Sequence, residues 1–366
     1  RDLPLLYNQW VSVLRWEKRT RPFLRTAEFH WQEGHTLHET REDAQNFALS
    51  IHYNVYIETI REFMAIDGIA GKKSSSEKFA GADTTYTFEP MMSNGWALQI
   101  CTSHLLGQGF MEGFGVNFQN RDGGISHPYY TSWGLSTRSI GGIISSHSDD
   151  KGLIIPPRIS EYMAMILPVY GKDNKEVVNA YARSLAEEMV GGTTEVPVQG
   201  EYFRAIIGPR GKVLLDLRDA RLGEKINDFE LSGYPVRIEC GERDLQSGKC
   251  VVASRISGEK VVIERSELTA TVDHMHTQGQ GMLFEASSKR LRENTVACET
   301  LEDVGRAIED GKFALYEWDG DPQMEIDIKE RFKATTRCIP FEGQFTDDLL
   351  KLKNPENVRV VIARSF

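Results

Sequence analysis

Apolar and polar residues alternate in two neighbouring runs near the start of the chain. The runs are Val13–Glu17 and Phe23–His35, and the polar loop Lys18–Pro22 separates them. A period of two is typical of a β-strand, and two such runs joined by a short loop predict an antiparallel hairpin. Residues two apart on a strand share a face, so Arg15 and Glu17 are expected to point the same way.

The predicted hairpin has a polar and aromatic surface. Its second run places one set of side chains on one face: Arg25, Ala27, Phe29, Trp31 and Glu33. With the first run, this surface gains two guanidiniums, two carboxylates and two aromatic rings. Such groups can clamp phosphates, stack a base and hold a small zwitterion. A hairpin that only covered a core would carry apolar residues there.

The following segments predict a mixture of helices and strands. Thr40 and Asp43 form a near capping box, and apolar residues then recur at helical spacing. The polar segment Gly71–Lys78 is expected to be a mobile loop. Two strands are expected at Thr84–Met92 and Trp96–Thr102.

The second half of the chain alternates between the two kinds of element. A helix is expected to begin near Ser136, and Met163–Val169 has the pattern of a short buried strand. A helix at Glu176–Met189 and then strands and turns up to Ile263 predict a small α/β domain with a partly parallel sheet. From about Ser266, a long helical stretch leads into a small mixed C-terminal module.

The composition narrows the function only slightly. The 366 residues suffice for two or three domains, and 40% are hydrophobic and 26% charged, as in globular proteins. A net charge of −10 argues against a protein that coats nucleic acid, but it permits binding of one folded RNA through a local basic face. The five scattered cysteines indicate reduced thiols in a cytosolic protein. No apolar run is long enough to span a bilayer.

Three strings of residues resemble motifs of one enzyme family. The hairpin resembles motif 2 of the class II aminoacyl-tRNA synthetases, and Arg25–His35 is similar to that motif in prolyl-tRNA synthetases of the archaeal and eukaryotic-like branch. The strings Thr131–Gly142 and His147–Arg158 resemble motif 3 of the same family, and Thr102–Gln108 resembles its amino-acid-pocket strand. Three long strings in order are far more specific than one short motif.

The resemblance implies a multidomain fold of the α+β and α/β classes. Residues 1–158 would form the class II catalytic domain, an antiparallel sheet with flanking helices. Residues 159–266 would form an α/β anticodon-binding domain. Residues 267–366 would form a mixed C-terminal domain that resembles a zinc-binding module without its cysteines. Motif 1, which builds the dimer interface in the family, is not visible in the chain.

The reaction that the resemblance implies has two steps. ATP activates proline to prolyl adenylate, and the 3′ end of tRNA(Pro) then accepts the prolyl group. Neither step needs a protein nucleophile, so catalysis would rest on positioning and charge stabilisation. The resemblance implies a cytoplasmic homodimer that uses ATP and Mg²⁺ and takes L-proline and tRNA(Pro), with no membrane and no DNA partner.

The implied ATP site combines arginines with an aromatic ring. Arg15 would bridge the α-phosphate and the proline carboxylate, because its planar fork meets two oxygens at once. Arg25 would hold the outer phosphates, Phe29 would stack on the adenine, and Glu17 would accept from its amino group. Arg15 and Arg138 would be the catalytic pair, and the alternative for both is a surface salt bridge. The full ATP set is Arg15, Glu17, Arg25, Thr26, Phe29, Gln99, Thr102, Ser136, Thr137 and Arg138.

The implied proline site has aromatic walls for the ring methylenes and a glycine that leaves space for the ring. It consists of Arg15, Trp31, Glu33, His104, Trp133 and Gly134. For His104, a histidine satisfied in the core is the alternative. Gln99 and Glu89 would supply oxygen ligands for Mg²⁺, and the alternative for Glu89 is a solvated strand carboxylate.

Two further sites lie in the later domains. Glu230, Arg237 and Arg243 match family positions that read the two guanines of the proline anticodon, since Arg pairs with guanine O6 and N7. The alternative is a surface charge network.

Relatives often bind zinc through four cysteines in the C-terminal module. Here Asp319 and Met324 stand where one pair would be, and the other pair would fall near Leu349–Leu352. Cys338 cannot build a tetrahedral thiolate site by itself, so zinc is not expected.

Two other functions are alternatives to the ligase. A non-catalytic tRNA-binding or regulatory relative would be expected to lack the ATP arginines, yet Arg15, Arg25 and Arg138 all remain. A free-standing ligase that charges a carrier or a small molecule would have little use for Glu230, Arg237 and Arg243.

Overall fold

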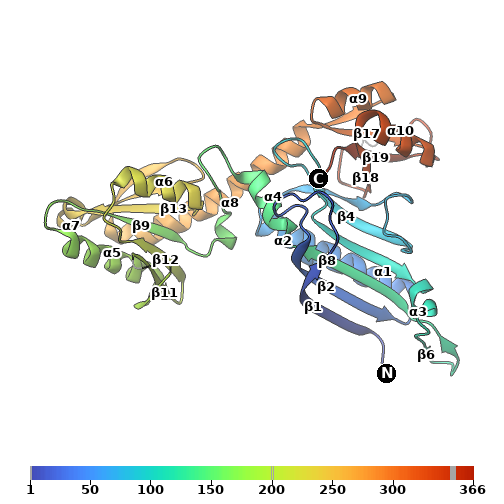
Figure 1. The fold of residues 1–366 in the computed structure, drawn as a ribbon, viewed down its shortest axis with the longest axis horizontal. Coiled ribbons are helices and arrows are strands. Elements are labelled where there is room, and N and C mark those ends of the chain that lie inside the picture. The colour runs from blue at the N-terminus through green and yellow to red at the C-terminus, as the bar shows by residue number, and fades with distance from the viewer. Residues whose placement is uncertain (1, 199, 201, 347–351) are drawn as a thin grey trace. The chain divides into compact units, whose positions relative to one another are not determined.

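The chain divides into two compact units. The computed structural model describes residues 2–198, 200, 202–346 and 352–366. Unit 1 comprises the residues up to 61 together with 66–146 and 287–366, and unit 2 comprises 62–65 and 147–286. Figure 1 shows the elements of both units. No helix among the described residues is both long and apolar enough to cross a membrane.

Unit 1 is built on one large sheet. Across its described residues, the sheet has ten strands in the order β1-β2-β8-β5-β4-β3-β18-β19-β17-β16. In that order the strands are Leu5–Leu14, Glu28–His38, Tyr129–Ser136, Cys101–Gly107, Thr84–Pro90, Gly68–Lys72, Thr335–Pro340, Val358–Ala363, Phe313–Trp318 and Thr295–Cys298. Neighbouring strands are antiparallel, except that β16 and β17 are parallel. A short helix α3 (Gly109–Gly113) and a small ribbon of β6 (Phe118–Gln119) and β7 (Ile125–Ser126) lie outside this sheet.

The predicted hairpin is confirmed, but its strands differ from the predicted runs. β1 spans Leu5–Leu14 and β2 begins at Glu28, so Arg15, Glu17 and Arg25 lie in the connection between the two strands and not on them. β1 begins at Leu5 and pairs antiparallel with β2, with Val13 opposite Phe29 and Gln9 opposite Glu33. Burial along β2 alternates, because Gln32 and Gly34 are buried while their neighbours are partly exposed. One face of β2 is therefore covered, whereas β1 is exposed along almost its whole length.

A continuous helical segment covers one face of this sheet. It consists of α1 (Arg41–Ser50), the π-helical turn η1 (Ile51–Ile57) and α2 (Glu58–Glu62). The capping prediction is confirmed, because the Thr40 side chain accepts a hydrogen bond from the Asp43 amide at 3.1 Å. Buried side chains of the helical segment, such as Ala48 and Ile60, pack in the core. The opposite face is partly exposed at β2 and β8, whereas β4 is buried on both faces.

The C-terminal module extends the same sheet. Its strands β16–β19 pack with α9 (Leu301–Glu309) and α10 (Pro322–Phe332), and β18 pairs with β3 through Ile339 opposite Lys72. The module therefore belongs to unit 1, while the long helix α8 (Leu268–Glu293) contributes residues to both units.

The segment Gly71–Lys78 differs from the mobile loop that its polarity suggested. Lys73 and Ser74 are buried. The Lys73 amide donates to the Thr85 carbonyl at 2.8 Å, and the Ser74 hydroxyl donates to the Glu325 carboxylate at 2.5 Å. The prediction was wrong because the partners that satisfy these polar groups lie far away in the sequence.

Unit 2 has the predicted α/β architecture with a partly parallel sheet. Its strand order over the described residues is β10-β11-β12-β9-β13-β14-β15, with β12, β9 and β13 parallel. The strands, in the same order, are Thr194–Pro197, Phe203–Gly208, Gly211–Asp216, Ala164–Val169, Val236–Gly241, Lys249–Ser254 and Lys260–Glu264. The helical elements are η2 (Pro157–Ile159), α5 (Lys175–Val190), α6 (Leu222–Ser232), α7 (Glu242–Ser247) and η3 (Arg265–Glu267). Apolar side chains pack on both faces of this sheet.

Candidate active site

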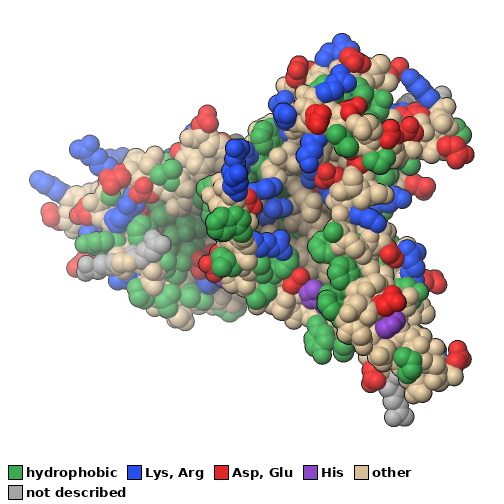
Figure 2. Space-filling model, turned by 45° about the vertical axis from the view of Figure 1, so that its right-hand side comes forward, with side chains coloured by type: hydrophobic (Ala, Val, Ile, Leu, Met, Phe, Trp, Pro, Cys, Tyr) green, Lys and Arg blue, Asp and Glu red, His purple; other side chains and the backbone are tan. Residues whose placement is uncertain are grey.

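A pocket of about 260 Å³ lies at the hairpin of unit 1. It is lined by Arg15, Glu17, Phe23, Leu24, Arg25, Thr26, Phe29, Ser136 and Arg138. These residues come from the β1–β2 hairpin and from the junction between β8 and α4 (Arg138–His147). Although the chain carries a net charge of −10, Figure 2 shows Lys and Arg side chains gathered near the middle of the view.

Arg15 lies over two aromatic rings. Its guanidinium carbon is 5.2 Å from the ring centres of both Phe29 and Trp31, and these two rings meet edge to face. Cation–π contacts of this kind hold a guanidinium without neutralising it. No carboxylate of the described residues forms an ion pair with Arg15. The guanidinium therefore remains available for an anionic ligand.

Arg138 occupies the other side of the pocket as the first residue of α4. Its Nε donates to the Leu24 carbonyl at 2.9 Å and its Nη1 donates to the Gln99 carbonyl at 3.2 Å. Burial and then the charge of Arg25 lower the pKa of the Arg138 guanidinium. Because carbonyl groups and not carboxylates hold the Arg138 guanidinium, its positive charge is not neutralised. Together with the neighbouring arginines, it creates a positive electrostatic potential that favours binding of a polyphosphate.

The structure brings most of the expected ATP residues together. Arg15, Glu17, Arg25, Thr26, Phe29, Ser136 and Arg138 all line the pocket. Arg25 and Glu17 form an exposed ion pair at 3.8 Å, a contact that contributes little to stability. Phe23 and Leu24 also line the pocket, and sequence reasoning missed them because they belong to the loop end of the hairpin.

Three expected ATP residues lie beside the pocket lining. The Thr137 amide donates to the His30 carbonyl at 3.0 Å and so closes the junction of β8 with β2. Gln99 contacts Arg138 through its backbone carbonyl. Thr102 lies on β5, opposite Gly134.

The open face next to the pocket carries most of the expected proline residues. Glu33, Gly134 and Thr102 form one row across β2, β8 and β5. A Cβ on Gly134 would lie 3.4 Å from the Trp31 ring, so the Trp31 side chain lies over the glycine. The Glu33 carboxylate accepts from Gln9 Nε2 at 2.8 Å, a partner that the sequence did not reveal.

His104 belongs to the next row on the same face. Its Nδ1 lies 2.9 Å from the Thr85 hydroxyl, and the Phe79 ring packs against it with a centre-to-centre distance of 5.1 Å. Burial lowers the pKa of His104 to about 4. The imidazole is therefore neutral near pH 7 and can act as a hydrogen-bonding wall rather than as a charge.

Trp133 does not share this surface, contrary to the expectation. It lies opposite Gly34, whose Cβ would fall 2.1 Å from the Trp133 ring. The ring also packs edge to face against Tyr56 of η1, with centres 6.3 Å apart. Gly34 faces the helical layer, so the Trp133 side chain lies on the covered face of the sheet. It is therefore on the other side of the strands from the proposed site.

Glu89 does not fit the role of magnesium ligand. Its side chain is fully buried. One carboxylate oxygen accepts from Lys73 Nζ at 2.6 Å and Thr87 Oγ1 at 2.8 Å, and the other accepts from Arg337 at 3.1 and 2.9 Å. Burial opposes ionisation, but the Arg337 and Lys73 charges outweigh it and lower the pKa of Glu89. Both carboxylate oxygens of Glu89 already accept hydrogen bonds. Of the two expected magnesium ligands, only the Gln99 side chain therefore remains.

The three expected anticodon residues do not form one cluster in unit 2. Arg237 Nε donates to Glu239 at 3.0 Å, and Lys260 joins the same carboxylate at 2.9 Å. Arg243 lies exposed in the first turn of α7, beyond the far end of β13. Four residue steps of strand separate Arg237 from the end of β13, roughly 13 Å at the usual rise. Glu230 lies 3.4 Å from Lys151 Nζ.

The region expected to replace a zinc site is only partly described. Asp319 accepts from the Asp321 amide at 2.9 Å, and Met324 packs in the core of the module. Leu349–Leu352 lies, apart from its last residue, outside the described residues. In the part of the chain that the structure describes, no group of three His, Cys, Asp or Glu side chains could hold a metal ion.

This sheet, with an arginine-bearing hairpin beside a pocket on its open face, defines the core of a class II aminoacyl-tRNA synthetase. Family models support that assignment over most of the chain. The tRNA synthetase class II core domain (G, H, P, S and T) matches residues 1–147, an anticodon binding domain matches 164–275, and the prolyl-tRNA synthetase C-terminal domain matches 301–366.

Curated relatives identify the family. A proline–tRNA ligase of Chlorobaculum tepidum is 41% identical over 375 residues, which cover 100% of this chain and 74% of the relative. A proline–tRNA ligase of Clostridium botulinum is 41% identical over 349 residues, covering 95% and 69%. Proline–tRNA ligase 2 of Clostridioides difficile is 41% identical over 347 residues, covering 94% and 68%. The chain belongs to the prolyl-tRNA synthetases, the aminoacyl-tRNA-forming ligases for proline.

Proposed function

We propose that the pocket of unit 1 activates proline with ATP and that the prolyl group then passes to tRNA(Pro). The observation that carries this proposal is the convergence of Arg15, Arg25 and Arg138 around one pocket, next to the row formed by Glu33 and Gly134. Three guanidiniums offset most of the negative charge of a triphosphate, and the adjacent row offers a carboxylate and the Trp31 ring to a small amino acid.

In the first step, a carboxylate oxygen of proline attacks the α-phosphorus of ATP and pyrophosphate leaves. Arg15 lies where the two substrates would meet, so its fork can hold an oxygen of each. Arg138 and Arg25 lie across the pocket and stabilise the charge that develops on the phosphates. In the second step, the terminal ribose hydroxyl of the tRNA attacks the prolyl carbonyl carbon and AMP leaves.

Proline would occupy the open row beside Trp31. The Trp31 ring, which lies over Gly134, would cover its methylenes, and Glu33 would accept from its ammonium group. The neutral His104 closes the end of the site without repelling that ammonium. Apolar walls of this kind discriminate between substrates that differ by one methylene by only about 1–3 kcal/mol of binding free energy.

Magnesium accompanies ATP in class II synthetases in general. The donor set of this chain does not fit a protein-borne magnesium site, because Glu89 is saturated by Lys73 and Arg337. Magnesium takes most of its oxygen ligands from phosphates and water when carboxylates are few. We therefore propose that ATP carries the ion and that Gln99 is the protein side chain nearest to it.

For tRNA recognition, we propose that Arg243 and Glu230 contact the anticodon directly. Arg243 is exposed, whereas Arg237 is held by Glu239 and packs over Phe229 with a guanidinium-to-ring distance of 5.6 Å. Arg237 could read a guanine only after leaving that carboxylate. It would therefore orient the RNA-binding surface more than it reads bases.

We further propose a cytoplasmic homodimer. Reduced thiols support the cytoplasm, because all five cysteines are buried and unpaired. The exposed strand β1 supports association, because it is an edge strand in the described sheet and presents Trp10 at 80% and Leu14 at 79% exposure. Sedimentation should show a dimer, and Trp10→Ser should weaken it.

We also infer that the chain belongs to the archaeal and eukaryotic-like branch. The string Arg25–His35 supports this placement, as does the short spacing between Arg25 and Arg138, which leaves no room for a large inserted editing domain. A phylogenetic tree built on the core domain would decide it.

The experiment that tests the function is aminoacylation with labelled proline. The full chain should charge tRNA(Pro) with proline and should lose most of this activity when the two anticodon guanines are replaced. Charging that is indifferent to the anticodon, or absent with proline, would contradict the proposal.

A further inference from the structure

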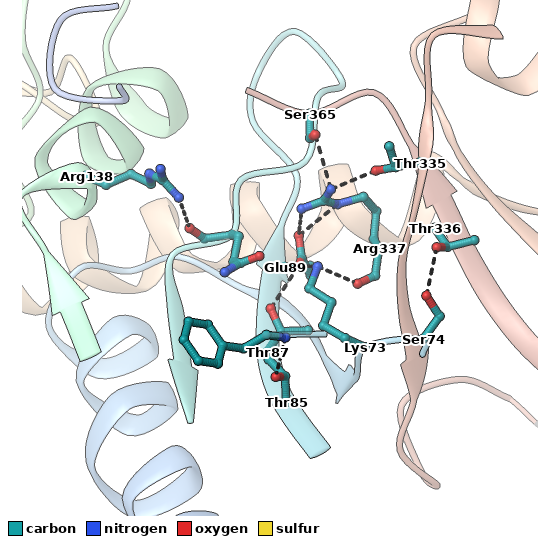
Figure 3. A network of polar contacts seen from close by, with 12 residues as sticks. Lys73, Ser74, Thr85, Thr87, Glu89, Arg138, Thr335, Thr336, Arg337 and Ser365 are labelled. Carbon is teal, nitrogen blue, oxygen red and sulfur yellow. Dashed lines mark hydrogen bonds and ion pairs between the residues drawn. The ribbon is translucent and has the colours of Figure 1, made fainter. Parts of the chain in front are cut away.

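A buried ion cluster joins the catalytic part of the sheet to the C-terminal module (Figure 3). Glu89 of β4 provides the carboxylate, Lys73 follows β3, and Arg337 lies on β18. Lys73 Nζ is 2.6 Å from one carboxylate oxygen, and Arg337 Nη2 is 2.9 Å from the other. The exposed fractions of the three side chains are 0%, 2% and 7% for Glu89, Lys73 and Arg337.

The C-terminal module fixes the cluster from several sides. Lys73 Nζ also donates to the Arg337 backbone carbonyl at 2.7 Å. Arg337 Nη1 donates to the Thr335 hydroxyl at 2.9 Å and to the Ser365 hydroxyl at 3.1 Å. The guanidinium is therefore held in one orientation by groups of its own module while it faces Glu89.

The cluster adjoins the wall of the ATP pocket. The Leu98 amide donates to the Pro90 carbonyl at 3.1 Å and the Ile100 amide donates to the Phe88 carbonyl at 3.3 Å. These two bonds place Gln99 opposite Glu89, on the neighbouring backbone. The Gln99 carbonyl in turn accepts from Arg138. Figure 3 shows Glu89 between Arg337 and Arg138.

A contribution to the free energy of folding does not explain why charged side chains, and not apolar ones, occupy this position. Two cations face one carboxylate, so the cluster carries a net positive charge in a dry interior. Buried ion pairs often stabilise a fold no better than apolar side chains of similar volume. An ion cluster does hold its side chains in one orientation. This is useful where the wall of a binding site must keep its position to within a fraction of an ångström.

We propose that Arg337 is a positioning residue for ATP, acting from the C-terminal module through Glu89 and Gln99 on Arg138. This inference rests on the proposed function, because it names what holds the ATP side of that same pocket. Loss of Arg337 would let Glu89 turn toward Lys73 and would shift the Gln99 backbone that holds Arg138. The proline row involves other residues and would be affected less.

The test uses the full chain in proline-dependent ATP–pyrophosphate exchange, with KM measured for ATP and for proline. Arg337→Met should raise KM for ATP by roughly 10- to 100-fold, the usual effect of a small misplacement, and should leave KM for proline within about twofold. Arg337→Lys should restore part of the loss because it keeps the charge but not the fork. The matched control is Arg331→Met, which removes an exposed arginine of the same module that pairs with Glu302.

A purely structural Arg337 would give a different result. The active fraction would fall while KM for ATP in the remaining enzyme stayed unchanged, and that outcome would overturn the proposal. If Arg337→Met does not fold, Ser365→Ala removes one bond to the guanidinium and should raise KM for ATP severalfold.

Calorimetric ATP binding separates this inference from the proposed function. A wild-type chain that shows no exchange with proline would refute the function. Weaker ATP binding by Arg337→Lys and Ser365→Ala than by the wild type would still support the positioning role, and equal binding would refute it.

Discussion

Glu33 of β2 lies directly opposite Gly134 of β8, and the Trp31 ring lies over the glycine. A carboxylate and an aromatic wall thus lie side by side, next to the pocket with three arginines. A small amino acid can place its ammonium on the carboxylate and its carboxylate toward Arg15. This relationship links the geometry of the sheet to the choice of substrate.

The first prediction concerns the space above Gly134. A Cβ there would make ordinary contacts at 3.4 and 3.5 Å, so Gly134→Ala should fold normally. The added methyl contacts Trp31, the proposed wall of the proline site, and narrows that site, and a methylene-sized difference is worth about 1–3 kcal/mol. KM for proline should rise at least tenfold, with KM for ATP nearly unchanged. An unchanged KM for proline would place the ring elsewhere.

The second prediction concerns the covered face of the same strands. Gly34→Ala would bring a Cβ within 2.1 Å of the Trp133 ring, which is held from below by Tyr56. Overpacking of this kind costs about 1–3 kcal/mol. Urea unfolding should show this loss for Gly34→Ala and almost none for Gly134→Ala, the control on the open face. Equal stability of both variants would contradict the placement of Trp133.

The third prediction concerns acid stability. Burial lowers the pKa of His52 and of His104 to about 4, from an ordinary value of 6.5. Between these values the unfolded chain binds protons that the folded chain does not, so the free energy of unfolding falls as pH decreases from 6.5 to about 4. The slope should reach at most about 1.4 kcal/mol per pH unit for each group.

Urea titrations between pH 7 and pH 4.5 measure this slope. His52→Phe should reduce it by up to one proton. A wild-type stability that does not change over this range would show that neither imidazole is kept neutral by burial.

The fourth prediction separates the two functions of the protein. Arg243 is exposed in unit 2, far along the chain from the pocket. Arg243→Ala should lower kcat/KM for tRNA(Pro) by about 10- to 100-fold, the effect of about 1–3 kcal/mol of lost base readout. Proline-dependent exchange should be unchanged. Arg210→Ala, which removes another exposed arginine of unit 2, serves as control.

Local patterns in the sequence were sufficient to predict several of the helices and strands. The alternation around Phe29 predicted the hairpin, the Thr40 cap predicted the first helix, and Met163–Val169 predicted a buried strand. These features depend on neighbours within a few residues, because strand and helix periods are local properties. The same alternation also placed Arg15 and Phe29 on one surface.

Sequence patterns could not predict contacts between side chains that are far apart along the chain. Glu89 meets Arg337, which lies 248 positions later, so the strand pattern could not show that its carboxylate was saturated. Ser74 meets Glu325 across 251 positions, and Lys73 and Ser74 of the polar loop are therefore buried, while Ser75 and Ser76 stay exposed. Trp133 resembles a pocket aromatic in type, but only the register with Gly34 reveals which face its ring occupies.

The most direct test of the central claim is proline-dependent ATP–pyrophosphate exchange by the full chain and by Arg15→Lys. The variant keeps the charge over Phe29 and Trp31 but lacks the planar fork that would hold an oxygen of each substrate. Exchange by the wild type with proline, and a loss of at least about 100-fold in kcat for the variant, is the predicted result. Exchange that is equally fast in Arg15→Lys, or that does not depend on proline, would contradict the account.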